Sequence, residues 1–237
     1  MDPNPSRAVG TVKNGSWEAE RVLISVKKRF VFVANSKTAS TSIEQSLGQV
    51  AEIQKSGNPA WKHMPLKTIR KEYDFLFGQE AYPFDSFFRF GVIRDPADWL
   101  MSWYRYRRGN DVEKPLPPEM TFEEFWEAGD WNIWRADGTP FDQSVRFLDD
   151  NGSPMADMII PQRRLGDFMP QIFEAFGVQG TLPKANVSKI RKLDDPLSDD
   201  MRAKIRAHYK RDYELIDRLY DINMRGLQKL SQVAGLR

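Results

Sequence analysis

Residues 29–47 read RFVFVANSKTASTSIEQSL, which predicts a strand, a polar turn and a helix in that order. Residues 30–34 are a short apolar run rich in β-branched and aromatic side chains, which is typical of a buried strand. The polar turn follows, and helical spacing begins at Ile43 and Leu47, with Glu44 expected to face away from the core. Such a turn lies at the N-terminus of a helix, where unpaired backbone N–H groups and the helix dipole favour an anion.

The side chains of the turn strengthen this interpretation. Lys37 adds a full positive charge, and four hydroxyls add donors, those of Thr38, Ser40, Thr41 and Ser42. The pattern GxxxxGK[ST] cannot be aligned here, which argues against a triphosphate bound with magnesium. The simpler alternative is a Ser/Thr-rich helix cap above a core strand.

A second strand-to-helix junction follows at residues 90–104, which read FGVIRDPADWLMSWY. Arg94 ends the predicted strand, and Ser102 lies about two turns into the helix that Pro96 begins. An arginine at the carboxyl end of a strand can hold a terminal phosphate through two parallel hydrogen bonds. The alternative is that Arg94 pairs locally with Asp95 or Asp98.

The composition limits the class of protein. The chain has 237 residues, 41% of them hydrophobic and 29% charged, as in a soluble globular protein. Its net charge of +2 does not indicate nucleic-acid binding, and no apolar run approaches the ~20 residues of a membrane span. The N-terminus lacks the features of a signal peptide, and the absence of cysteine excludes disulfides and thiolate metal sites. We therefore expect a cytoplasmic protein.

We expect residues 1–17 to form a loose arm and residues 18–237 to form a single domain. Alternating strands and helices predict an α/β fold, with a mostly parallel central sheet between layers of helices. The first two strands are expected to form a hairpin at the edge of the sheet. The expected strands are 21–26, 30–34, 87–93 and 157–160, and the later helices are 65–77, 96–107, 121–128, 164–176 and 201–220. Thr121 and Glu124 form a predicted capping box, Gly177 is expected to end the helix at 164–176, and Ser198 is expected to begin another helix.

Together, the two junctions resemble the sulfotransferase superfamily, whose phosphosulfate-binding loop usually reads PKTAGTS or PKSGTT and whose second element reads VRDPxxxxxSxY. Lys37-Thr38-Ala39 and Thr41-Ser42 match the loop, while Ser36 replaces the usual Pro and Ser40 the usual Gly. The resemblance implies a P-loop-like, three-layer fold. It also implies the donor 3′-phosphoadenosine-5′-phosphosulfate (PAPS), used without a metal.

The resemblance covers residues 20–222 and is closest to the branch that includes carbohydrate sulfotransferases. Segments 61–65 (WKHMP), 182–188 (LPKANVS) and 209–215 (YKRDYEL) are similar to segments of that branch. The chain departs from it at 161–165, where PQRRL replaces a usual Glu-Asn-Leu.

Roles follow from the resemblance. Lys37 would stabilise the leaving phosphate, and His63 would remove the proton of the acceptor, with Glu44 as the alternative base. The implied donor-binding residues are Ser36, Lys37, Thr38, Ala39, Ser40, Thr41, Ser42, Arg94, Ser102, Asn186 and Ser188. The implied acceptor is a small molecule or glycan that offers a hydroxyl or an amine.

Two other functions remain compatible with the sequence. One is a P-loop-like kinase of a small molecule, although no Walker A loop is present. The other is a non-catalytic domain that binds a nucleotide or a glycan, which the Ser40 substitution and the missing Glu-Asn-Leu would suit.

Overall fold

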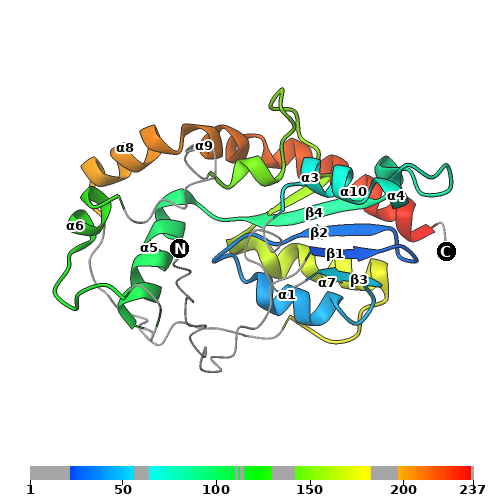
Figure 1. Ribbon diagram of the computed structural model, residues 1–237, viewed down its shortest axis with the longest axis horizontal. Coiled ribbons are helices and arrows are strands. Elements are labelled where there is room, and N and C mark those ends of the chain that lie inside the picture. Colours follow the sequence, from blue (N-terminus) through cyan, green and yellow to red (C-terminus); the bar gives the residue numbers. More distant parts are fainter. Residues whose placement is uncertain are drawn as a thin grey trace, which may run out of the picture.

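The computed structural model describes residues 22–55, 64–109, 112, 115–129, 142–182 and 197–235. Its centre is a five-stranded sheet of order β3-β1-β2-β4-β5 (Figure 1). The strands are β1 Val22–Ser25, β2 Phe30–Val33, β3 Ile53–Lys55, β4 Phe88–Ile93 and β5 Met158–Pro161. Strands β2, β4 and β5 pair in parallel, whereas β1 pairs antiparallel with both β2 and β3.

The expected α/β architecture is confirmed, and the sheet is parallel over its three strands β2, β4 and β5. The β1–β2 hairpin was also predicted correctly, but it is not the edge of the sheet. The edge on that side is β3, a three-residue strand with the sequence IQK, whose length and polarity give no strand signal.

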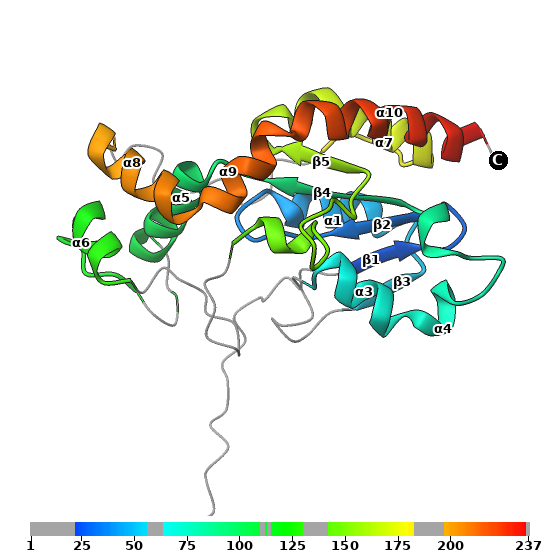
Figure 2. The same cartoon turned by 90° about the horizontal axis from the view of Figure 1, so that it is seen from above.

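Helices cover both faces of the sheet. The α-helices are α1 Ser40–Leu47, α3 Leu66–Glu72, α4 Asp74–Phe77, α5 Pro96–Gly109, α6 Phe122–Glu127, α7 Leu165–Phe176, α8 Asp199–His208, α9 Lys210–Asp217 and α10 Leu219–Gly235. The 3₁₀ turns in the described part of the chain are η1 Phe84–Ser86, η2 Ser144–Arg146 and η3 Gln162–Arg164. Helices α1 and α7 pack on one face, and α3, α4 and the start of α10 lie over the other (Figures 1 and 2).

Several helix ends lie where the sequence places them. The Thr121–Glu124 capping box begins α6, Ser198 caps α8, and Gly177 ends α7 with a positive φ of 65°. Two long helices are interrupted, however. The helix expected over residues 65–77 breaks at Tyr73, and the one expected over 201–220 is three helices that extend to Gly235. None of the helices in the described segments is both long and apolar enough to cross a bilayer.

Helix α5 runs away from the sheet, beyond the carboxyl end of β4 (Figure 1). It packs with α6 and α8 around a third hydrophobic core, which contains Trp99, Tyr104 and Phe125. The β4–α5 junction therefore lies between the sheet and a separately packed group of helices.

Helix α10 closes the edge of the sheet at β5. The Asn223 side chain accepts from the backbone N–H of Ile159 at 2.8 Å and donates to its carbonyl at 2.9 Å, as a neighbouring strand would. Both backbone groups of Ile159 at this edge are thereby satisfied without another strand. Gly226 permits this approach, because a Cβ there would lie 2.3 Å from the backbone oxygen of Asp157.

We predict that Gly226→Ala lowers the free energy of unfolding by about 1–3 kcal/mol, because helix and strand must move apart. Gly166→Ala in α7 is the matched control. Its added Cβ meets nothing within 4 Å, so we expect no change or a gain of up to ~1 kcal/mol from helix propensity. Urea unfolding measures both variants, and an equal response would contradict the close packing of α10 on β5.

Candidate functional site

The two predicted phosphate-binding junctions lie side by side. Because β2 and β4 pair in parallel, their carboxyl ends lie next to each other, and the turns that follow them begin at the same end of the sheet. The Arg94 guanidinium reaches the first turn and donates from Nη1 to the carbonyl oxygen of Lys37 at 3.2 Å. The fold thus joins two segments that are 57 residues apart in the sequence.

The backbone of the first turn is unusual. Lys37 and Ala39 have positive φ angles of 60° and 64°, and residues other than glycine seldom adopt this backbone conformation. Ala39 is the N-cap of α1 and offers no side-chain cap. The N–H groups at the start of α1 are therefore not covered by a capping side chain, and alternating backbone conformations of this kind form anion-binding concavities.

The hydroxyls of the turn divide into different roles. Thr38 donates from Oγ1 to the carbonyl of Asn35 at 2.8 Å, so it stabilises the turn. The Oγ of Ser36 is buried and has no hydrogen-bond partner among the described residues. Ser40 and Ser42 are buried at the start of α1, and Thr41 is half-buried.

Helix α5 also contacts the turn that follows β2. The indole of Trp99 donates from Nε1 to the carbonyl of Ser36 at 3.0 Å. The Lys37 ammonium lies 3.6 Å from the ring centre of Tyr106 and 5.4 Å from that of Trp103. These cation–π contacts place the charge of the turn against α5.

Arg94 is half-buried, and burial lowers the pKa of its guanidinium below the usual value. The positive charges of Arg105 and Arg163 lower it further, while Asp98 and Asp95 oppose the shift. Asp98 forms an ion pair with Arg163, with 3.5 Å between Oδ2 and Nη2. Within the described segments the Nε of Arg94 has no hydrogen-bond partner, although it is buried.

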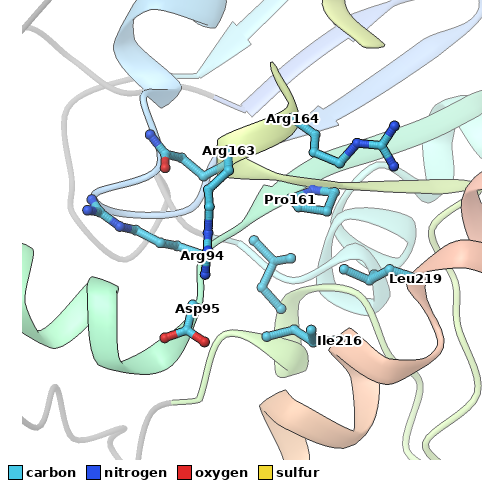
Figure 3. A pocket seen from close by; sticks show the side chains of 9 residues that line it. Arg94, Asp95, Pro161, Arg163, Arg164, Ile216 and Leu219 are labelled. Atoms are coloured by element: carbon cyan, nitrogen blue, oxygen red, sulfur yellow. The ribbon is translucent and has the colours of Figure 1, made fainter. Parts of the chain in front are cut away.

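A pocket of about 250 Å³ adjoins Arg94 at the carboxyl ends of β4 and β5 (Figure 3). Its lining residues are Ile93, Arg94, Asp95, Pro161, Gln162, Arg163, Arg164, Ile216 and Leu219. Arg163 reaches toward Arg94 and Asp95, whereas Arg164 points away and pairs with Asp167 at 2.8 Å. The pocket therefore combines apolar walls with positive charge on one side.

A buried polar network beneath the two turns was not predicted from the sequence. Asn35 and Gln143 are fully buried, and the Asn35 Nδ2 donates to the Gln143 Oε1 at 2.8 Å. Asp212 on α9 accepts from the backbone N–H groups of Gln143 and Ser144 at 3.0 and 2.8 Å. Asn35 begins the predicted polar turn, and Asp212 lies in the segment YKRDYEL that the family resemblance singles out, whereas Gln143 carried no sequence signal.

Other expected site residues have different outcomes. Ser102 is half-buried on α5, two turns from Arg94. The expectation that Glu44 faces away is wrong, because α1 is covered on several sides and Glu44 is only 7% exposed. His63, Asn186 and Ser188 lie outside the described residues.

Burial raises the pKa of Asp212 from 3.8 to about 6, and the charge of Asp142 adds to the shift, while the two backbone hydrogen bonds oppose it. We predict that this carboxyl titrates near pH 6 in the folded protein. Its folded pKa exceeds its unfolded one, so its contribution to stability is present below pH 3.8 and is lost as the pH rises through about 6.

Carbon-13 NMR of the side-chain carboxyl measures this pKa directly, with Asp212→Asn to identify the signal. A midpoint near pH 4 would contradict the prediction and would show that the hydrogen bonds to Gln143 and Ser144 fully offset the effect of burial.

The family comparison agrees with the motifs at both turns. A family model described as "Sulfotransferase family" matches residues 20–225, which include both turns, α5, the pocket and Asp212. Searches of curated proteins and of solved structures gave no significant match.

Proposed function

Because this chain belongs to the sulfotransferase family, we propose that it transfers a sulfuryl group from PAPS to a hydroxyl or amine on a small molecule or glycan. The observation that carries the proposal is the contact between Arg94 and the carbonyl of Lys37. It joins the two elements that resemble the 5′- and 3′-phosphate sites of the family. A donor with a phosphate at each end would span the two turns.

The polar groups at these turns suit such a donor. Arg94 Nε and Ser36 Oγ are buried without a hydrogen-bond partner among the described residues. A buried polar group left unsatisfied costs about 1–3 kcal/mol. Phosphate oxygens are strong acceptors for both groups, and Arg94 remains charged at neutral pH, so binding of the donor would remove this cost.

Lys37 is proposed to stabilise the charge that develops on the leaving phosphate. The donor supplies an activated sulfuryl group attached to that phosphate. The lysine side chain has a flexible four-carbon stem, so its ammonium can leave the ring of Tyr106 and approach the phosphate without moving the turn. The positive-φ backbone and the start of α1 would supply N–H donors to the same oxygens.

The pocket beside Arg94 is proposed to receive the nucleoside of the donor. Ile93, Pro161 and Leu219 provide apolar walls that suit an aromatic base and a sugar. Contacts with the nucleoside and the 3′-phosphate would provide binding energy at a distance from the reaction. This energy would align the phosphosulfate group for transfer.

His63 is proposed as the general base, because imidazole titrates near working pH and family members carry a histidine in this segment. Glu44 is the alternative base. The carbohydrate branch supports a glycan or a related small molecule as acceptor.

We predict that 3′,5′-adenosine diphosphate, the nucleotide product, stabilises the protein without magnesium and that ATP does so much less. At 100 times its dissociation constant the product should contribute ~2.7 kcal/mol, or about 5–10 °C in the unfolding midpoint. Differential scanning fluorimetry with and without magnesium measures the shift. Equal stabilisation by ATP, or a requirement for magnesium, would favour the kinase alternative.

Arg94→Ala should weaken binding of this product more than Ser102→Ala. The first removes charged hydrogen bonds worth about 1.5–3 kcal/mol, and the second removes a neutral one worth about 0.5–1.5 kcal/mol. Titration calorimetry gives both affinities. The reverse order would mean that Arg94 serves the turn rather than the ligand.

His63→Ala should leave product affinity nearly unchanged and reduce turnover about 10²–10⁴-fold, the usual range for a positioned acid–base group. Transfer of labelled sulfate to a panel of acceptors measures turnover. Near-normal turnover in the variant would pass the role to Glu44. A wild type that binds the nucleotide but sulfates no acceptor would favour the non-catalytic alternative.

A further inference from the structure

We infer that Gln143 is a positioning residue that sets the relative placement of the two phosphate-binding turns, and that Asp212 holds Gln143 in place. This inference rests on the proposed function, because it concerns a ligand that spans both turns. Neither residue is expected to touch the donor. Both are fully buried, at 0% exposure.

The Gln143 side chain contacts both turns at once. Its Oε1 accepts from the Asn35 Nδ2 at 2.8 Å and from the backbone N–H of Arg94 at 3.0 Å. Its Nε2 donates to the carbonyl of Arg94 at 2.8 Å. A single amide therefore binds the start of the first turn and both backbone groups of the key residue of the second.

The strand ladder does not hold these positions. Pairing between β2 and β4 ends at Val33 and Gly91, before either turn begins. Asn35 and Arg94 lie beyond the last pair, so their separation depends on side-chain hydrogen bonds. The Asn35 Nδ2 also reaches the carbonyl of Val92 at 3.2 Å, and the Gln143 amide continues the connection to Arg94.

Asp212 fixes the position and the orientation of this amide. Its carboxylate accepts from the backbone N–H groups of Gln143 and Ser144, and the Gln143 Nε2 lies 3.5 Å from the Asp212 Oδ2. A flipped amide would place its NH₂ against the donors of Asn35 and Arg94 and its oxygen near the carboxylate. Only one orientation of Gln143 therefore satisfies all its neighbours.

The test compares two nucleotides. 3′,5′-Adenosine diphosphate carries both phosphates and needs both turns, whereas adenosine 5′-monophosphate carries only one phosphate. Gln143→Met keeps the approximate volume of the side chain and removes its hydrogen bonds. We expect the dissociation constant for the bisphosphate to rise about 10- to 100-fold, the range found when groups that orient metal ligands are removed. Affinity for the monophosphate should change less than about threefold.

Asn223→Leu is the matched control. Asn223 is also a buried amide that holds two backbone groups, but it acts at the edge of β5. It should lower the unfolding midpoint while the ratio of the two affinities stays that of the wild type. Asp212→Asn is the second variant, measured if Gln143→Met does not fold. It should reduce the ratio of the affinity for the bisphosphate to the affinity for the monophosphate.

The outcomes separate the two hypotheses. A wild type that binds neither nucleotide refutes the proposed function. A wild type that prefers the bisphosphate, with the same preference in Gln143→Met or Asp212→Asn, refutes the positioning role. An equal loss for both nucleotides also refutes it, because general damage to the site would weaken every ligand.

Discussion

The parallel pairing of β2 with β4 is the constraint on which the site depends. Its register sets Phe30 opposite Phe88 and Val33 opposite Gly91, so the carboxyl ends of both strands lie side by side. Each strand is followed by a turn and a helix, and the second turn reaches the first through Arg94 and Lys37. Neither turn alone could hold a ligand with two distant phosphates.

The core makes this pairing rigid. Phe30, Phe32 and Phe90 point to one face of the sheet, where Phe176 of α7 packs against Phe30 with ring centres 4.8 Å apart. Rings packed to crystal-like density resist small shifts of the strands. The turns can therefore keep an unfavourable backbone, with positive φ at Lys37 and Ala39, that isolated residues would avoid.

Local signals in the sequence predicted local structure well. The apolar run before Asn35, the capping box at Thr121 and the glycine at 177 act over a few residues, so the elements that they mark were predicted correctly. The family resemblance implied that both turns bind one donor, and the parallel pairing of β2 with β4 in the structure explains why the two turns lie together.

The features that were missed depend on distant partners. Strand β3 exists because β1 pairs with it, and its own three residues carry no pattern. Glu44 is buried by neighbours that its helical position alone does not reveal. Gln143 lies 108 residues from Asn35 and 69 from Asp212, so no spacing rule connects them.

The most direct test of the account is a crystal structure of the protein with 3′,5′-adenosine diphosphate bound. We expect the 5′-phosphate within hydrogen-bond distance of the N–H groups at the start of α1, with the Lys37 ammonium on it rather than on Tyr106. The 3′-phosphate should contact the Arg94 guanidinium. A nucleotide bound away from these two turns, or one that contacts only one of them, would contradict the claim that the two turns together bind the donor.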